Sequence, residues 1–317
     1  MPVSRGSGNT EKHQPGTAEW YLEHRRYLLS VAYRMLGTFA DAEDVVQDVF
    51  LHLQLVDSER IRDARPFLTK MVVRRSLDVL KSARRKRETY VGPWLPEPDV
   101  RLRGEETAGG ILLEESVAYA LLVVLERLTP GERAVFLLHE AFGYGYAETA
   151  EALGKSEAAC RQLMSRVRRK LNRELPEPVS KPEENELTLR FLQACASGRM
   201  ESLLELLRED IAMFTDGGGV VTAAPRPIYG PEKTSAFLLG LAAKFIRDGA
   251  EVVPADINGH TGVLFREQGV WTTVLAFEWR EGRLRRIYGV RNPAKLERLP
   301  SVTAPKPDNA PPGPPRS

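Results

Sequence analysis

Cysteine is scarce in this sequence: Cys160 and Cys195 are the two present among 317 residues. Two cysteines can form neither a disulfide framework nor, on their own, a zinc site. No apolar stretch approaches the roughly 20 residues that span a bilayer, and the polar N-terminus lacks the apolar region of a signal peptide. We therefore expect a reduced, cytoplasmic protein that makes no membrane contact and holds no metal or cofactor.

Net charge is also nearly absent, because 45 basic and 43 acidic residues give a formal charge of +2. As an average, this value argues against nucleic-acid binding, which needs a basic surface to neutralise phosphates. The charges are segregated along the chain, however. Residues 41–59 hold six acids and no Lys or Arg, residues 60–90 hold eleven bases against three acids, and residues 156–173 carry a net +5. The small total therefore conceals one acidic and two basic segments.

Apolar periodicity and proline-rich stretches divide the chain into three structured parts. With 42% apolar residues, the chain can build more than one hydrophobic core. We predict a multi-domain protein with two all-α units and a C-terminal α+β unit. The expected segments are a disordered N-terminus (1–18), a first helical unit (19–90), a linker (91–110), a second helical unit (111–174), a short linker (175–182), the α+β unit (183–299) and a proline-rich disordered tail (300–317).

The acidic segment is expected to form an amphipathic helix that starts near Ala40. Apolar residues recur on one of its faces, while Asp41, Asp44 and Asp48 recur at helical spacing on the other. An acidic face of this kind is, taken alone, most simply a solvated surface.

The most specific local pattern lies at residues 129–173. Thr129-Pro130-Gly131-Glu132 predicts a helix start, because the threonine caps, the proline suits the first position and the glutamate completes a capping box. Short helices are expected at 146–153 and 157–172, with Gly154 in the turn between them, which predicts a helix-turn-helix. Arg and Gln side chains can bind base edges in the major groove, although a solvated basic face is the alternative. The candidate DNA-binding residues of the second helix are Arg161, Gln162, Ser165, Arg166 and Arg169.

The C-terminal third changes character, because strand-like runs replace helical periodicity. Helical segments are expected at 184–208 and 231–247, and Glu281-Gly282 predicts a hairpin turn. The strands are expected at about 211–215, 251–258, 261–267, 270–280 and 283–290.

The sequence of the acidic helix carries a family resemblance. Asp41-Ala42-Glu43-Asp44-Val45-Val46-Gln47-Asp48-Val49-Phe50-Leu51 resembles the core-polymerase-binding helix in region 2 of sigma-70-type transcription initiation factors. Residues 121–171 resemble region 4 of the same family, and two such regions joined by a short linker are typical of its extracytoplasmic-function (ECF) group. The resemblance implies core RNA polymerase as a partner, through its β′ clamp helices and β flap. The residues implied to bind polymerase are Asp41, Asp44, Gln47 and Asp48.

The resemblance also implies contacts with the −10 and −35 elements of promoter DNA. Region 2 of the family opens the −10 element and captures an unstacked base in a loop, and residues 57–65 occupy that place here. Cations of this loop and of the helix that follows could hold phosphates of the opened strand. The candidates are Arg60, Arg62, Arg65, Lys70, Arg74, Arg75 and Lys81.

The α+β unit resembles a SnoaL-like domain of the NTF2-like superfamily, in which helices and a curved sheet form a cone. ECF factors with this extension, the SigJ-like group, carry three signatures that are implied to regulate through contacts between domains. Ala294 and Val220 depart from the family pattern by removing a carboxylate and an expected basic residue. The signature residues here are Trp94, Leu95, Pro96, Glu97 and Pro98 in the linker, Asp216, Gly217, Gly218 and Gly219, and Asn292, Pro293, Lys295 and Leu296.

Three functions remain open from the sequence. The chain is interpreted as a sigma factor controlled by its fused C-terminal domain. A helix-turn-helix regulator that acts without polymerase is the second possibility, although it would have no use for the acidic helix. The third is a DNA-tethered NTF2-like enzyme, with Asp216, Asp256 or His260 as acid or base. An unknown small ligand could also occupy the cone, lined by Trp271, Phe277, Trp279 and Tyr288.

Overall fold

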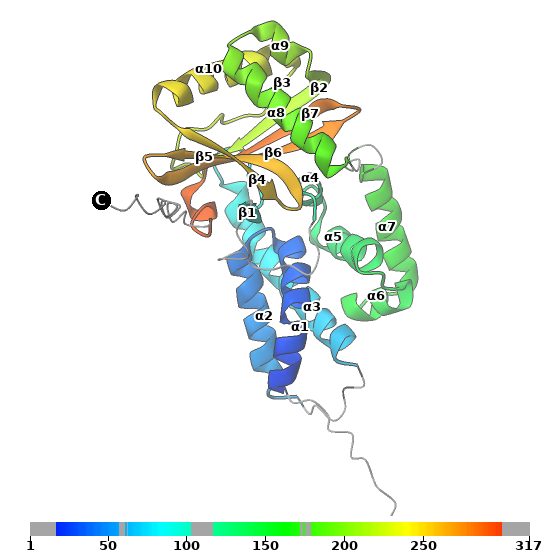
Figure 1. The fold of residues 1–317 in the computed structure, drawn as a ribbon. Helices are drawn as coiled ribbons and strands as arrows, with labels where there is room; N and C mark the ends of the chain where they lie inside the picture. Colours follow the sequence, from blue (N-terminus) through cyan, green and yellow to red (C-terminus); the bar gives the residue numbers. More distant parts are fainter. Residues whose placement is uncertain are drawn as a thin grey trace, which may run out of the picture.

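The computed structural model describes residues 17–56, 61, 63–102, 117–171, 174 and 179–299. Predictions for residues 1–16 and 300–317, and for Arg60 and Arg62, fall outside this part of the chain. Figure 1 shows two helical groups beneath a twisted sheet whose far face carries further helices. The predicted combination of two all-α units and a C-terminal α+β cone is confirmed. None of the described helices is long and apolar enough to cross a membrane.

The first helical unit is an antiparallel three-helix group made of α1 (Thr17–Leu36), α2 (Phe39–Leu53) and α3 (Ala64–Glu88). Gly37 ends α1 in the left-handed conformation, with φ +78°, which a residue without Cβ adopts at little cost. The apolar stripe of α2 is buried, as the periodicity predicts. Its acidic residues are left on the opposite face.

The second helical unit contains the predicted helix-turn-helix. Its elements are α4 (Tyr119–Leu125), α5 (Pro130–Phe136), a π-helical turn (Leu137–Ala141), α6 (Tyr146–Leu153) and α7 (Glu157–Leu171). The capping box of Thr129 and Glu132 is present, and Gly154 turns the chain with φ +61°. Buried residues from Trp20 to Leu171 form one continuous core. The two helical units therefore pack as a single body.

The C-terminal unit is one seven-stranded sheet with helices on one face. The strand order is β1-β4-β5-β6-β7-β2-β3, antiparallel except for the parallel pair β2 and β7. The three hairpin turns each place a residue and a following glycine at positive φ, including the predicted Glu281-Gly282. The strands are β2 (Leu207–Asp216), β3 (Ile228–Tyr229), β4 (Glu251–Ile257), β5 (His260–Glu267), β6 (Val270–Arg280) and β7 (Arg283–Val290), and the helices are α8 (Lys181–Ser197), α9 (Met200–Leu204) and α10 (Pro231–Arg247).

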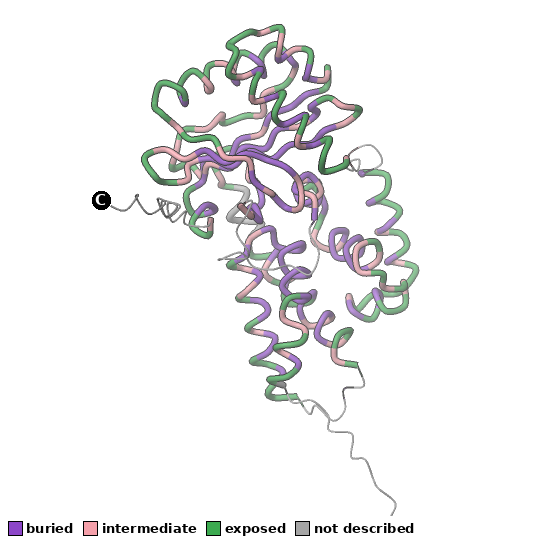
Figure 2. Tube along the Cα trace, viewed as in Figure 1, coloured by how far each residue is buried: buried purple, intermediate pink, exposed green. Residues whose placement is uncertain are grey.

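The segment expected as a linker, 91–110, is structured in its described part. Residues 95–100 are buried, and β1 (Val100–Leu102) pairs with β4 as an edge strand of the C-terminal sheet. The sequence did not reveal this strand, because its proline-rich approach is typical of a loop. The sheet face that points away from α8 and α10 packs against this segment and α4. The sheet is therefore covered on both faces, and much of it is purple in Figure 2.

Candidate functional site at the junction of the domains

Asp216, the last residue of β2, is fully buried, and its carboxylate accepts four hydrogen bonds. Its Oδ2 accepts from the Leu95 amide at 2.9 Å and from Lys295 Nζ at 2.7 Å. Its Oδ1 accepts from the Tyr90 hydroxyl at 2.6 Å and from the Gly218 amide at 3.0 Å. A buried carboxylate is tolerated only when it is paired and hydrogen-bonded. These five residues, here called the Asp216 node, join the end of the first helical unit to all three family signatures.

Lys295 and Trp94 extend the node towards the first helical unit. Lys295 Nζ lies 4.2 Å from the centroid of the Trp94 ring and also donates to the carbonyl of Leu95. A Cβ at Gly37 would stand 2.8 Å from Cη2 of the same ring. The Trp94 ring thus fills the space that a glycine leaves between α1 and α2, while its face covers a buried ammonium group.

Glu97 caps the acidic helix. Thr38, at the N-cap of α2, makes no capping bond with its own side chain. Instead, Glu97 Oε2 accepts a hydrogen bond from the Phe39 amide at 2.8 Å, and the Glu97 amide donates to the carbonyl of Gly37 at 2.8 Å. Burial raises the pKa of Glu97, while the Phe39 amide and the Arg298 guanidinium oppose that shift. The linker signature therefore holds the N-terminal end of α2.

Tyr33 forms a second buried contact between the domains. Its hydroxyl donates to the carbonyl of Glu97 at 2.6 Å and accepts from Asn258 Nδ2 at 3.1 Å. Asn258, in the β4–β5 turn, also accepts from the Asp99 amide at 3.0 Å and donates its own amide to the Asp99 carbonyl at 2.7 Å. Burial raises the pKa of Tyr33 far above its ordinary value. Helix α1, the linker and the sheet meet at this hydroxyl.

The other signature residues support these contacts through packing. Pro96 accepts a hydrogen bond at its carbonyl from the Tyr119 hydroxyl of α4 at 2.6 Å. Pro98 and Leu296 are buried, whereas Pro293 is exposed. The linker thus contacts both helical units and the sheet.

The backbone at the three consecutive glycines lies so close to its neighbours that a side chain at any of them would crowd or clash with other atoms. A Cβ at Gly217 would stand 2.3 Å from the Val221 carbonyl oxygen, and one at Gly218 would stand 2.6 Å from the Asn292 amide group. A Cβ at Gly219 would lie 3.2 Å from Val91. Gly218 also adopts φ +66°.

The two departures from the family pattern lie outside these contacts. Ala294 is exposed, and the neighbouring Lys295 finds its carboxylate in Asp216 rather than at position 294. Val220 is 75% exposed. The node is therefore complete without a charge at either position.

Gly218→Ala is expected to destabilise the protein by about 2–3 kcal/mol, because it adds both a left-handed strain and a clash with buried Asn292. Gly249→Ala is the matched control, since Gly249 has the same φ of +66° with no atom within 4 Å of a new Cβ. The control is expected to cost about 1 kcal/mol from strain alone. Urea unfolding measures both, and equal losses would contradict the close packing of Gly218 on Asn292.

The acidic face of α2 is partly open to solvent. Asp44 and Gln47 are exposed, Asp41 accepts from the Thr38 hydroxyl at 2.6 Å, and Asp48 pairs with Arg75 at 2.7 Å. A groove of about 440 Å³ runs beside it between α1 and α2, with Phe50 and half-exposed Leu51 among its lining residues. The four predicted polymerase-binding residues thus lie together on one accessible face.

Two of the predicted DNA-binding cations of α3 contact the helix-turn-helix, and the other three contact the first helical unit itself. Lys70 pairs with Glu151 of α6 at 2.7 Å. Arg74 donates from Nε to the Ala152 carbonyl at 2.8 Å and from Nη2 to the Glu151 carbonyl at 3.0 Å, so it covers the C-terminal end of α6. Arg65 stacks over the Tyr27 ring at 3.9 Å. Arg75 binds Asp48 as described above, and Lys81 binds Asp78 at 2.9 Å.

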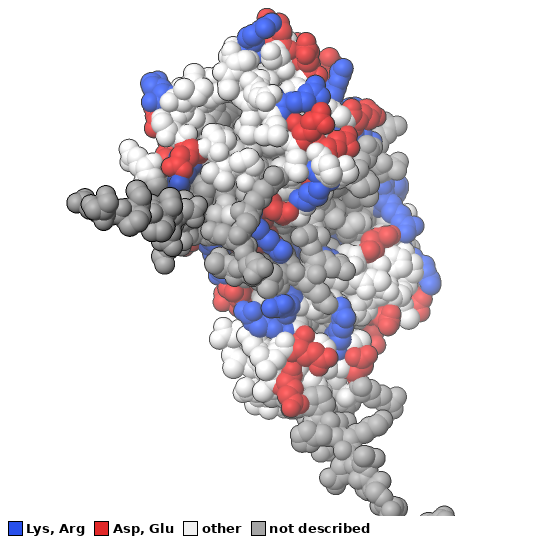
Figure 3. Space-filling view, viewed as in Figure 1, with Lys and Arg blue, Asp and Glu red and all other residues white. Residues whose placement is uncertain are grey.

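The predicted DNA-binding residues of α7 are all exposed on its outer face, opposite its buried stripe. Arg161 pairs with Glu157 at 2.8 Å and lies over the Tyr146 ring. On the molecular face in Figure 3, Lys and Arg mix with Asp and Glu over the helical units. Several cations of α3 and α7 thus already pair with carboxylates of the same chain.

The predicted acid or base residues of the cone do not meet in one site. Asp216 belongs to the node, Asp256 pairs with Lys181 at 2.7 Å, and His260 pairs with buried Glu184.

A cavity of about 100 Å³ between α8, α10 and the sheet is lined by apolar side chains and by Cys195, whose pKa burial raises to about 12. None of the four predicted aromatic residues lines this cavity. Phe277 and Trp279 instead line a smaller pocket between the start of α4, the start of α8 and the sheet, together with His260 and Glu184, whereas Trp271 and Tyr288 line neither pocket.

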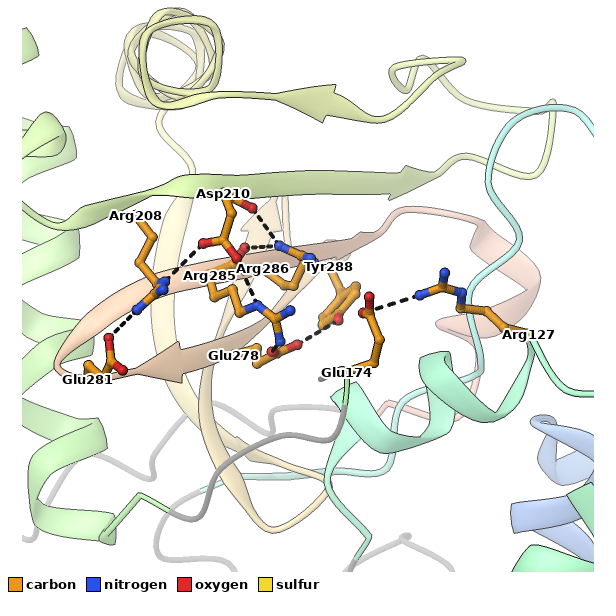
Figure 4. Close-up of polar contacts among 9 residues, drawn as sticks. All are labelled: Arg127, Glu174, Arg208, Asp210, Glu278, Glu281, Arg285, Arg286 and Tyr288. Carbon is orange, nitrogen blue, oxygen red and sulfur yellow. Dashed lines mark hydrogen bonds and ion pairs between the residues drawn. The ribbon is translucent and has the colours of Figure 1, made fainter. Parts of the chain in front are cut away.

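Figure 4 shows where polar groups do gather on the sheet. Glu278 Oε1 accepts from Arg285 at 3.0 Å and its Oε2 accepts from the Tyr288 hydroxyl at 3.1 Å, while Arg285 also reaches Asp210. Burial raises the pKa of Glu278. Each of these groups already has a protein partner, so the cluster is structural. Among the described residues, no group of three or more His, Cys, Asp or Glu could hold a metal ion.

Four residues of the junction were not singled out from the sequence. Tyr90 and Tyr33 read as ordinary helical residues, and Arg298 follows its signature without a pattern of its own. Asn258 stands in an Asn-Gly pair, a strong turn signal that could have placed it at a hairpin tip. Their partners lie 64 to 255 residues away, beyond the reach of local pattern.

Comparisons with known proteins agree with this architecture. Residues 20–86 match the family model for Sigma-70 region 2, and residues 119–171 match the model for Sigma-70, region 4. The chain is 37% identical over 288 residues to the ECF RNA polymerase sigma factor SigJ of Mycobacterium tuberculosis, covering 87% of this chain and 92% of that protein. It is 33% identical over 293 residues to the probable ECF sigma factor SigI of the same species, covering 91% and 97%.

The crystal structure of Mycobacterium tuberculosis SigJ is similar throughout. Its TM-score is 0.72 at 34% sequence identity, and the match covers 89% of this chain and 99% of that one. The C-terminal sheet and the node thus lie within a fold that the two proteins share. Two family models in the expected order, together with relatives of nearly full length, show that the chain belongs to the ECF sigma factors of the sigma-70 family.

Proposed function

We propose that the chain is an alternative sigma factor that directs core RNA polymerase to its promoters, and that its C-terminal domain restrains it. The observation that carries the first part is an exposed acidic face on α2 in the same body as an exposed basic face on α7. An acidic face suits a basic protein partner, and a basic recognition helix suits the major groove. A regulator without polymerase would need the second face alone.

The proposed restraint rests on contacts within the chain that involve the elements expected to bind DNA and polymerase. Lys70 and Arg74 hold α6, and the linker holds the N-terminal end of α2 through Glu97. Promoter phosphates would compete with α6 for the same cations. A bivalent contact with −10 and −35 DNA loses most of its avidity when its two halves cannot separate. The C-terminal domain contacts both helical units and so favours this closed arrangement.

We further propose that the C-terminal domain acts by binding rather than by catalysis. The cavity between α8, α10 and the sheet offers Cys195 and apolar side chains, and the burial that raises the thiol pKa disfavours the reactive thiolate. Acid–base chemistry needs a titratable group within reach of a substrate. Asp256 is held instead in an ion pair with Lys181, and His260 contacts buried Glu184, both at the start of α8.

Run-off transcription with purified core polymerase tests the proposal. The full-length chain is expected to co-elute with core enzyme and to support initiation from a cognate promoter that core alone does not transcribe. Arg166→Ala on α7 is expected to lower initiation by about tenfold to a hundredfold, because one base or phosphate contact is worth about 1–3 kcal/mol. Arg190→Ala, at an exposed position of α8, is the control. A chain that binds promoter DNA but never core enzyme would favour the polymerase-independent regulator.

A further inference from the structure

The segment that follows the last signature reaches the acidic helix. Leu296 is buried and Leu299 packs against the same apolar cluster on the outer face of the sheet. These two anchors fix the short turn between them. In Figure 1 this orange-red segment lies between the sheet and the upper end of α2. Arg298, between these two anchors, therefore lies beside α2.

Arg298 binds two carboxylates at the N-terminal end of α2. Its Nη2 lies 2.7 Å from Glu43 Oε2, and its Nε lies 3.8 Å from Glu97 Oε1. Glu97 is the buried cap of α2, whereas Glu43 lies on the helix itself, with its side chain 32% exposed. The Glu43–Glu97 pair is hereafter called the carboxylate seat. Arg25 lies 3.9 Å from Glu43 and is a weaker partner.

The position of the seat gives this contact its significance. Glu43 lines the groove between α1 and α2 together with exposed Asp44 and Gln47, and Glu43, Glu97 and Asp44 raise the pKa of Arg298. Asp41, Asp44 and Asp48 make the rest of the face expected to receive a basic partner. A cation from the C-terminal domain therefore already occupies one end of that face.

We propose that Arg298 is an internal stand-in for a basic group of core polymerase, which must displace it from the carboxylate seat when the sigma factor binds. This inference rests on the proposed function, since it takes the acidic face of α2 as the polymerase contact. Glu43 already has Arg298 on Oε2 and Arg25 near Oε1. A further guanidinium or ammonium group must therefore displace Arg298 to reach this carboxylate, because like charges at contact distance repel. The C-terminal domain thus competes directly for the polymerase-binding helix.

The test measures binding of labelled full-length protein to core polymerase for wild type and for Arg298→Ala. The variant is expected to bind about threefold to tenfold more tightly, because displacing a partly exposed ion pair costs on the order of 1 kcal/mol. The gain is expected mainly in the association rate at low salt and shrinks as salt rises. Arg247→Ala, an exposed arginine of α10 paired with its neighbour Asp248, is the matched control and is expected to leave affinity unchanged.

The same measurement in a Glu43→Gln variant separates direct competition for Glu43 from weaker docking of the C-terminal domain. In Glu43→Gln the seat loses its accessible charge, so Arg298→Ala is expected to give no further gain there. A gain that persists in Glu43→Gln would overturn the inference, since Arg298 would then act by docking the C-terminal domain. Unchanged or weaker binding of Arg298→Ala in the wild-type background would overturn it as well. Failure of the wild-type chain to bind core enzyme would instead overturn the proposed function.

Discussion

Asp216→Ala is expected to destabilise the protein by about 3–5 kcal/mol, the largest effect of any single substitution in the junction. The change leaves Lys295 buried without its carboxylate and removes the acceptor of the Tyr90 hydroxyl and of the Leu95 and Gly218 amides. Unpaired buried donors each cost about 1–3 kcal/mol when water cannot reach them. Chemical denaturation is expected to show a lower midpoint, and limited proteolysis is expected to cut near residues 91–102 earlier than in wild type.

The double variant Asp216→Ala/Lys295→Met separates the ion pair from the rest of the node. Removing both charges eliminates the unpaired buried ammonium, so the double variant is expected to be more stable than Asp216→Ala alone. Asp256→Ala breaks a partly exposed pair with Lys181 and removes the acceptor of the Gly259 amide. It serves as the control, with an expected loss of about 1–2 kcal/mol. Similar losses for Asp216→Ala and Asp256→Ala would contradict the role of the node.

Local chemistry predicted much of the fold. The capping box at Thr129, the turn glycine at Gly154 and the hairpin at Glu281-Gly282 each depend on a few adjacent residues, and all three are present. Five of the seven strands of the C-terminal sheet were located from strand-like apolar runs. Strands β1 and β3 were not predicted, and the helix expected at 184–208 was wrong at its end, since the chain breaks at Gly198 and β2 begins at Leu207. The sheet is nevertheless mixed, since β2 returns parallel to β7 through a connection that no local pattern reveals.

Long-range contacts account for what the sequence did not reveal. The linker was expected as a connection, yet Val100 pairs with Ile257 and Leu95 donates to Asp216, each more than a hundred residues away. The charge pattern correctly separated an acidic from a basic helix. It could not show that Lys70 and Arg74 bind α6, because the approach of α6 to α3 is set by their shared apolar core.

Deletion of residues 183–317 is expected to raise core binding and promoter-dependent transcription by on the order of tenfold. It removes β4, which pairs with the linker strand, and it removes Asp216, Asn258 and Arg298, which hold the linker and α2. Contacts between the helical units themselves, such as those of Lys70 and Arg74 with α6, would then be the remaining resistance to their separation on DNA. Run-off transcription and a binding assay with core enzyme measure the change. Deletion of residues 300–317 alone is the control and is expected to change neither quantity.

Cleavage of the chain provides the sharper comparison, because deletion also exposes apolar surface. Leu95, Val100, Tyr119 and Ala120 pack on the outer sheet face and would become accessible in the truncated chain. A protease site placed at residues 175–178 would instead cut the covalent connection while leaving that face covered. Since the β1–β4 pairing, the node and the Tyr33–Asn258 contact each join residues before the cut to residues after it, the cleaved halves are expected to stay together and to remain restrained. Activation by cleavage alone would mean that the connection before α8, and not the docked linker, carries the restraint.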